Sequence, residues 1–404
     1  MKTVFILVDA LKSTYLTEEN MPFLYSLAKE NFYVKEIIPC VGFCERSEIF
    51  TGLDGYDTGN FTAIGYSKEN SPYKSDKLVL KLATLISSIH SGITKKIFQK
   101  WRKRVGRRLN CYRIPYTSLS KFSLTEDGNV KYTNYSTIFD VLKRKGFTYT
   151  LHAFTALSDL KPRNTKKLVD FFEDEIAKDT YFVPLYIGTI DTVGHKYGAD
   201  IESIKPYLYE VDCELKRIFE IANCNGYFFS VLGDHGMVPV TDKINVMKEI
   251  EKCNLTIGID YEAFYDSTIA RFWFYNGKAK KLITQTLSER FSKYGLLIEA
   301  GEAVKHRIPM DIVNKDGSPV YGNLVWCANP GVLISPDYFH STEASENGMH
   351  GYLSVVRGDG TGLYISNNKR GILEEMLSSN ICHELCESLA IDVPNNETWK
   401  RTII

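Results

Sequence analysis

The sequence predicts an α/β fold with a mostly parallel central sheet flanked by helices, and two observations lead to this prediction. Four short apolar runs have the composition of strands buried on both faces of a sheet, at residues 3–8, 148–153, 182–190 and 227–232. Segments with helical periodicity lie between these runs. Alternating strands and helices are typical of a parallel sheet covered by helices.

Helical segments are recognised by apolar residues that recur on one face. The pattern predicts helices at residues 21–31, 137–145 and 207–221. Gly146 follows the second segment and is expected to end it. Residues 372–389 carry a similar stripe, with Leu373 and Leu385 among its apolar positions, and predict a C-terminal helix.

Residues 246–340 have a different pattern of apolar and polar residues, which predicts an inserted α+β cap subdomain. Alternating residues at 271–275 indicate a strand, residues 277–294 a helix and residues 296–299 a second strand. The chain then returns to the main sheet. Residues 1–245 and 341–404 are therefore expected to form the α/β core.

The charge of the chain is unevenly distributed. The 404 residues include 49 Lys and Arg and 49 Asp and Glu, a net charge of zero that argues against a protein whose whole surface binds nucleic acid. Residues 77–125 nevertheless hold 12 Lys and Arg and no acid, and apolar residues recur there at every fourth position from Leu85 to Leu109. This predicts a basic amphipathic helical insertion within the core.

The basic insertion has two interpretations. It is either a lid whose cations attract an anionic substrate, or a peripheral contact with an anionic membrane, which sedimentation with anionic vesicles at low salt would test. We expect no specific nucleic-acid partner, because the chain contains no recognised nucleic-acid module.

Two further features suggest a cytoplasmic protein. Association with a membrane through the basic insertion stays open. No apolar run reaches the roughly 18 residues that span a bilayer, and the N-terminus lacks the cleavage site of a signal peptide. The nine Cys are scattered without a Cys-x-x-Cys pair, which favours reduced thiols.

Six residues with metal-ligand chemistry stand at or near the ends of expected strands. The carboxyl ends of parallel strands are where α/β proteins hold their ligands. Carboxylates and imidazoles in this number suit two divalent ions, zinc or alternatively manganese, better than one. The six are Asp9, Asp191, His195, Asp234, His235 and His350.

Taken together, these motifs resemble the alkaline phosphatase superfamily, and most closely its nucleotide pyrophosphatases and type I phosphodiesterases. The matching pieces, in order, are residues 7–10 (LVDA), 50–53 (FTGL), 189–195 (TIDTVGH), 233–237 (GDHGM) and 349–352 (MHGY). The resemblance implies an alkaline-phosphatase-like fold and hydrolysis of a phosphate ester or pyrophosphate by two metal ions.

The resemblance also implies how the six residues are shared. Asp191, His195 and His350 would hold one ion, and a nucleophile would bridge it to the other. The second ion would be held by Asp9, Asp234 and His235.

The chain departs from the family at the nucleophile. Relatives have a Thr, Ser or modified Cys about nine residues before the Thr-Gly pair, and here that position is Gly42. Three hypotheses follow: Cys44 attacks as a thiolate, Ser47 attacks, or water attacks directly. Arg46 would bind an anionic oxygen, and Asn60 would donate a hydrogen bond to a phosphoryl oxygen.

Several functions remain open at this point. A phosphodiesterase or nucleotide pyrophosphatase is expected first. A phosphomonoesterase, a phosphomutase or a phosphonate hydrolase would use the same ligands. An inactive homologue that only binds a metal or an anion is also consistent with the missing nucleophile.

Overall fold

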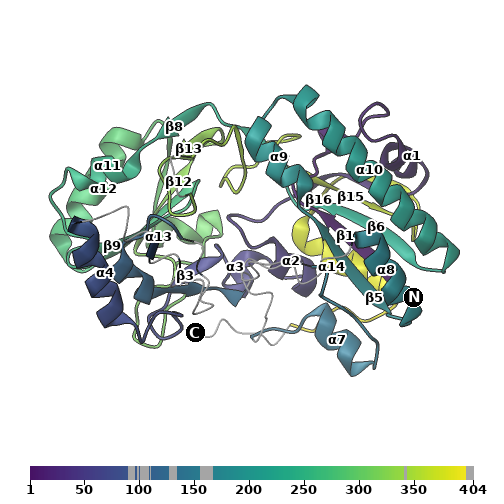
Figure 1. The fold of residues 1–404 in the computed structure, drawn as a ribbon, viewed down its shortest axis with the longest axis horizontal. Coiled ribbons are helices and arrows are strands. Elements are labelled where there is room, and N and C mark those ends of the chain that lie inside the picture. Colours follow the sequence, from purple (N-terminus) through teal and green to yellow (C-terminus); the bar gives the residue numbers. More distant parts are fainter. Residues whose placement is uncertain are drawn as a thin grey trace.

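The computed structural model describes residues 1–89, 96–97, 100, 109, 111–126, 134–154, 167–340 and 344–396. Figure 1 shows two lobes. One, the core lobe, contains the central sheet and the helices on its two faces. The other, the cap lobe, contains a second sheet, and the helices α2 and α3 lie between the two.

The core lobe is built on a six-stranded sheet in the order β16-β2-β15-β6-β1-β5. β1 pairs in parallel with both β5 and β6, and β16 pairs in parallel with β2, whereas β15 runs antiparallel to both of its neighbours. The strands are β1 (Thr3–Val8), β2 (Phe32–Ile38), β5 (Phe182–Ile187), β6 (Phe228–Gly233), β15 (Gly362–Ser366) and β16 (Gly371–Leu377). The predicted α/β fold with a mostly parallel sheet is confirmed.

Helices cover both faces of this sheet, and each face has its own apolar cluster. β1 is buried along its whole length, so it contributes to both clusters. The core-lobe helices are α1 (Pro22–Glu30), α2 (Glu45–Thr51), α3 (Gly55–Thr58), α7 (Ile138–Arg144), α8 (Leu168–Ala177), α9 (Thr189–Tyr197), α10 (Ile201–Cys224) and α14 (Ile381–Leu389).

The cap lobe is built on a four-stranded antiparallel sheet in the order β11-β12-β10-β9. Its strands are β9 (Tyr261–Tyr265), β10 (Ile269–Phe274), β11 (Gly295–Glu299) and β12 (Leu324–Ala328), and its helices are α11 (Val246–Glu251), α12 (Gly277–Phe291) and α13 (Ala300–Ala303). The predicted helix and two predicted strands of residues 246–340 are all present. The boundaries of the domains stay a prediction.

Short strand pairs complete the connections. β7 (Val238–Pro239) pairs with β14 (Gly348–Met349), β8 (Asp242–Ile244) with β13 (Val332–Ile334), and β3 (Ile64–Tyr66) with β4 (Phe122–Leu124). The first of these pairs is where the chain leaves the core lobe and returns to it. As a result, His235 and His350 stand on either side of the whole insertion.

The described part of the basic insertion packs on the cap lobe. Helix α4 (Lys77–Ile89) buries Leu80 in the same apolar cluster as the second sheet, while Leu78 and Leu85 are exposed. Most of the predicted helical stretch beyond α4 lies outside the described residues, so its role as lid or membrane contact stays a prediction. Among the described residues, no helix is both long and apolar enough to cross a membrane.

Two predicted elements differ from the structure. Residues 148–153 form only a single bridge, between Tyr149 and Phe182, although they run beside β5 and exchange several backbone hydrogen bonds with it. Residues 371–377 form the edge strand β16 instead of the first turns of a helix, and Ile372 and Leu373 are largely exposed there. The helix begins only at Ile381. All nine Cys are described, and all are free thiols.

Candidate active site

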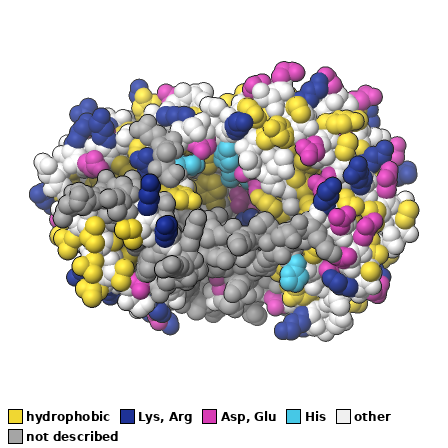
Figure 2. Space-filling view, viewed as in Figure 1, with side chains coloured by type: hydrophobic (Ala, Val, Ile, Leu, Met, Phe, Trp, Pro, Cys, Tyr) yellow, Lys and Arg dark blue, Asp and Glu magenta, His cyan; other side chains and the backbone are white. Residues whose placement is uncertain are grey.

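A pocket of about 600 Å³ opens where the two lobes meet, and all six predicted metal ligands line it. Figure 2 shows the corresponding hollow near the middle of the molecule, with histidine and acidic side chains at its edge. Residues of both lobes line the pocket, since Asp266 and Phe339 contribute from the cap side.

Two neighbouring strands bring the first three ligands together. Asp9 directly follows β1, and Asp234 and His235 directly follow β6. Because β1 and β6 are parallel and in register, with Leu7 opposite Leu232, their carboxyl ends meet at the same edge of the sheet.

The other three ligands come from a helix and a short strand. Asp191 and His195 lie four residues apart on α9 and therefore share one face. His350 follows β14, which packs so closely on α9 that a Cβ atom at Gly348 would lie 2.5 Å from the carbonyl oxygen of Gly194. Only glycine permits this approach, which brings His350 to the pocket.

The six side chains form two compact trios. In the first, His235 Nε2 lies 3.1 Å from Asp9 Oδ1 and 3.8 Å from Asp234 Oδ1. In the second, Asp191 Oδ1 lies 3.1 Å from His195 Nε2 and 3.5 Å from His350 Nε2. Within each trio the ligand atoms all lie within 4.8 Å of one another.

The trios are neighbours, because the His235 and His350 rings stack with their centroids 3.8 Å apart. Each trio is therefore compact enough to surround one ion, and the two positions adjoin.

The surroundings of the imidazoles suit metal ligation. His195 Nδ1 lies 2.9 Å from the carbonyl oxygen of Gly348, and His235 Nδ1 lies 2.8 Å from that of Gly236. A carbonyl can only accept, so both Nδ1 atoms donate and both Nε2 atoms turn toward the carboxylates.

This arrangement leaves acceptors facing each other. Asp9 Oδ1 and Asp191 Oδ1 are buried, and among the described residues neither has a hydrogen-bond donor as long as the imidazole beside it is neutral. With Nδ1 protonated, each meets an Nε2 lone pair at 3.1 Å, so a second proton or a cation must lie between the two atoms. The donor set fits a divalent transition ion.

Burial and charge shift the pKa values of the first trio apart. Burial raises the pKa of Asp234 to about 7, and the charge of Asp9 adds to this. Burial also raises the pKa of Asp9, but hydrogen bonding and charge from His235, the charge of His350 and the hydroxyl of Tyr186 together hold it below its usual value. Burial lowers the pKa of His235, but the charge of Asp234 and contact with Asp9 raise it well above its usual range.

The second trio contains imidazoles of opposite behaviour. Burial, together with the charges of His235 and His195, holds the pKa of His350 well below its usual value. Burial also acts to lower the pKa of His195, but the hydrogen bond and charge of Asp191 raise it overall. Strongly shifted groups of this kind gather at functional sites.

Helix α2 contributes two side chains to the pocket, Glu45 and Arg46. The charge of Arg46 lowers the pKa of both Asp234 and Tyr186, which puts its guanidinium among the ligands. Glu45 is 8% exposed, and its carboxylate lies within 4.8 Å of the ligand nitrogens of His235 and His350. The sequence singled out Arg46 but gave no role to Glu45.

The structure does not bring the other predicted catalytic and binding residues into the pocket. The Ser47 hydroxyl is fully buried and donates to the carbonyl oxygen of Cys44 at 2.9 Å. Asn60 is buried and donates through Nδ2 to the Tyr135 hydroxyl at 2.6 Å.

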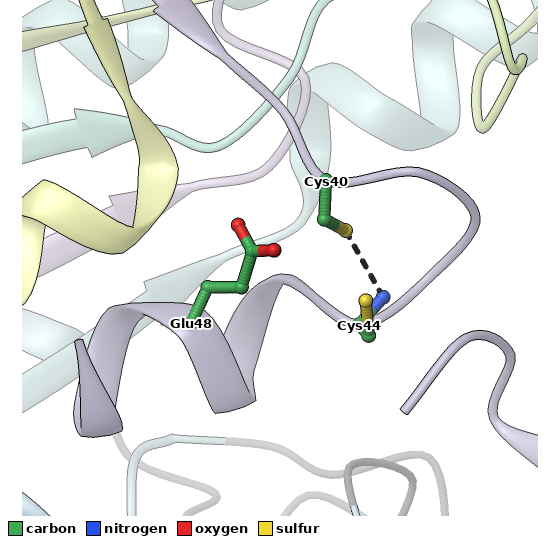
Figure 3. Close-up of side chains that lie close together, drawn as sticks. All are labelled: Cys40, Cys44 and Glu48. Carbon is green, nitrogen blue, oxygen red and sulfur yellow. Dashed lines mark hydrogen bonds between the residues drawn. The ribbon is translucent and has the colours of Figure 1, made fainter. Parts of the chain in front are cut away.

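Cys44 belongs to a separate buried cluster. Figure 3 shows Cys44 at the start of α2, with Cys40 and the carboxylate of Glu48 close by. The Cys44 amide donates to Cys40 Sγ at 3.2 Å, and Cys44 Sγ packs so closely on Gly55 that a Cβ there would lie 2.4 Å from the sulfur. Glu48 accepts from the Gly55 amide and the Ser378 hydroxyl.

Gly42 has no space for a side chain. Its φ is +85°, and a Cβ atom built there would lie 2.1 Å from the carbonyl oxygen of Phe61. The same carbonyl accepts a hydrogen bond from the Phe43 amide at 2.8 Å, which fixes the loop. Phe43 in turn packs edge-on against His350. A hydroxyl residue at position 42 would require the backbone to move.

The rim of the pocket carries further polar side chains that the sequence did not indicate. His340 Nδ1 lies 2.8 Å from Asp337 Oδ2, and its Nε2 lies 2.8 Å from Glu346 Oε1. Lys196, next to His195 on α9, also lines the pocket. The position of His340 was not predictable because Asp337 and Glu346 stand in segments without periodicity.

Comparisons with known proteins agree with this geometry. The family model of type I phosphodiesterase / nucleotide pyrophosphatase matches residues 3–353. A search of curated proteins finds no match.

Solved structures show the same fold. Human ectonucleotide pyrophosphatase / phosphodiesterase 5 is 14% identical with a TM-score of 0.67, and the murine protein is 16% identical with a TM-score of 0.63. An inactive threonine-to-alanine variant of the murine protein in complex with AMP is 15% identical with a TM-score of 0.63. Each alignment covers 97% of this chain and 96% of the other. At this identity the likeness concerns the fold. The family model spans most of the sequence, and the chain belongs to the type I phosphodiesterase/nucleotide pyrophosphatase family, whose members are phosphoric ester hydrolases.

Proposed function

We propose that this chain hydrolyses a phosphodiester or pyrophosphate linkage in a nucleotide-sized substrate, with two divalent metal ions. The observation that supports the proposal is the pair of adjoining Asp/His trios in one pocket of about 600 Å³. A pocket of this size suits a small ligand. The AMP in the complex of the murine relative supports a nucleotide.

The trios would hold one ion each, as the family resemblance implies. Asp191, His195 and His350 would bind the first. Bound divalent ions supply Lewis-acid stabilisation of the charge on a phosphoryl group. Mixed imidazole and carboxylate ligation favours zinc, with manganese as the alternative. The other trio, Asp9, Asp234 and His235, would bind the second.

The remaining polar residues would orient the substrate. Arg46 would bind phosphoryl oxygens, because a guanidinium presents two parallel donors. Lys196 adds a second positive charge on the pocket wall. The acids around them repel an anion, so substrate binding would depend on the metal ions.

The proposal is tested with purified protein, reconstituted with Zn²⁺ or Mn²⁺, on bis-p-nitrophenyl phosphate and on the p-nitrophenyl monoester. We expect the diester to be the better substrate, and chelation to abolish turnover. Asp234→Ala should lower kcat/KM by at least about 100-fold, since it removes a ligand. The exposed Asp170→Ala is the matched control and should retain activity.

Two results would contradict the proposal. A preference for the monoester would indicate a phosphomonoesterase. Silence on a broad panel of esters, with ions bound, would indicate a binding protein without activity.

A further inference from the structure

Glu45 stands where the two trios meet. Its carboxylate, His235 and His350 have ligand atoms within 4.8 Å of one another, and these two histidines belong to different trios. The carboxylate therefore lies close to one histidine of each trio. This inference rests on the proposed function and concerns the residue that replaces the missing nucleophile.

The backbone around Glu45 holds it there. It is the first residue of α2, directly after the loop in which Gly42 is locked against Phe61 and Phe43 against His350. Glu45 also lines, together with His235 and His350, a second small cavity of only about 20 Å³, space for about one water. The residue thus borders both this cavity and the substrate pocket.

The charge of the site is consistent with a role for Glu45. Burying a carboxylate is costly unless a cation or several donors accompany it. With Asp9, Asp191 and Asp234, Glu45 brings the ligand set to four carboxylates. Two divalent ions would balance those four charges.

We propose that the Glu45 carboxylate serves as a seventh ligand beside His235 and His350, between the two trios, and that water attacks phosphorus directly. The bond from the water oxygen to phosphorus forms as the bond to the leaving oxygen breaks. The water proton passes to solvent, and the leaving oxygen departs with the bonding electron pair. No covalent enzyme intermediate forms.

The first test measures metal binding without turnover. Apo protein is titrated with Zn²⁺ by calorimetry, and ion content is measured by mass spectrometry after gel filtration. Glu45→Gln, which keeps the shape and removes the charge, should bind at least one ion about tenfold or more weakly than the wild type. Glu45→Asp should lie between the two. The exposed Glu69→Gln is the matched control.

This measurement has a clear contrary result. The proposal would be overturned if circular dichroism shows that the Glu45→Gln variant is folded and this variant binds Zn²⁺ with wild-type stoichiometry and affinity. Glu45→Asp serves the same purpose if the Gln variant does not fold. Because no substrate is involved, the result stands even if the proposed hydrolase activity is not found.

The second test reads the number of displacements at phosphorus. A diester made chiral with sulfur and oxygen isotopes should be hydrolysed with inversion, as one direct displacement requires. Retention of configuration would indicate a covalent intermediate and would overturn the proposal. So would loss of turnover in Cys44→Ala or Ser47→Ala with ion content intact, since either result would assign the attack to that side chain.

Discussion

Two sites with buried carboxylates, one in each lobe, differ in the groups that face the carboxylate oxygens. In the cap lobe, Asp266 is buried against Arg271, whose Nη2 atom lies 3.0 Å from Asp266 Oδ2. Arg271 also donates to the Ile64 carbonyl oxygen and lies over the rings of Phe264 and Trp273. In the core lobe, the ligand carboxylates meet imidazole nitrogens that point at them. The cap lobe supplies its own cation, the guanidinium of Arg271. The core-lobe site has the set of donor atoms that suits a metal ion taken up from solution.

The source of the cation decides whether it serves the fold or the chemistry of the site. A cation that belongs to the chain fixes the fold permanently, but it cannot be released or replaced. Burial raises the pKa of Asp266 to about 6 even though Arg271 acts against this, so the internal pair is itself costly. A site that takes its cations from solution leaves their charge directed at a substrate.

The largest expected effect comes from breaking the internal pair. Arg271→Met should lower the free energy of unfolding by about 3–5 kcal/mol, because it leaves the Asp266 charge buried and unpaired. The double variant Arg271→Met, Asp266→Leu should recover most of that loss. Urea unfolding measures both.

The control for this pair is an exposed one. Lys280→Met removes the partner of Glu299 at the surface and should cost less than about 1 kcal/mol. Equal losses for Arg271→Met and Lys280→Met would remove the contrast between the lobes.

A smaller effect is expected when ions are added to the core-lobe site. Zn²⁺ at 100 times its dissociation constant should raise the free energy of unfolding of apo protein by about 2.7 kcal/mol through binding to the native state. Asp234→Asn should lose most of this gain, while Asp170→Asn should keep it. Thermal melts with and without chelator measure the gain, and an undiminished gain in Asp234→Asn would argue against the first trio as an ion site.

The smallest effect concerns His340 at the pocket rim. The hydrogen bond with Asp337 is the main cause that raises the pKa of His340 above its usual value, and the charge of Glu346 adds to it. A raised histidine pKa stabilises the fold fully below the unfolded value near 6.5, and this contribution is lost as the pH rises through the folded value.

His340→Gln should therefore destabilise the protein by up to about 1 kcal/mol at pH 6 and by less at pH 9. Urea unfolding at both pH values measures the difference. The exposed His383→Gln is the control. A loss that is the same at both pH values would exclude a charged His340 from the rim.

The sequence was most informative where function follows directly from local structure. Asp9 and Asp234 come straight after buried strands, and Asp191 and His195 share a helical face, so pattern alone predicted that they would meet. Glu45 was missed because its position depends on the path of the loop before it, which turns at Gly42 through a positive φ that no periodicity reveals. The same loop carries Cys44 away from the pocket, although its distance along the chain suggested the opposite.

A similar limit explains the error at residues 371–377. Their apolar side chains fit a helical stripe, but they form an edge strand on β2 whose apolar residues remain exposed. Only the pairing partner, far away in the sequence, distinguishes the two outcomes.

The pairing of β7 with β14 has a consequence for how such a protein can change over time. The chain departs at Val238 and Pro239 and returns beside them at Gly348 and Met349. Residues 240–347 form one continuous segment, and its two ends are held together by this strand pair next to the site. This segment can therefore vary in length between two fixed ends without displacing His235 or His350. The cap lobe as a whole cannot be exchanged so simply, because residues from Ile64 to Phe122 share its apolar core.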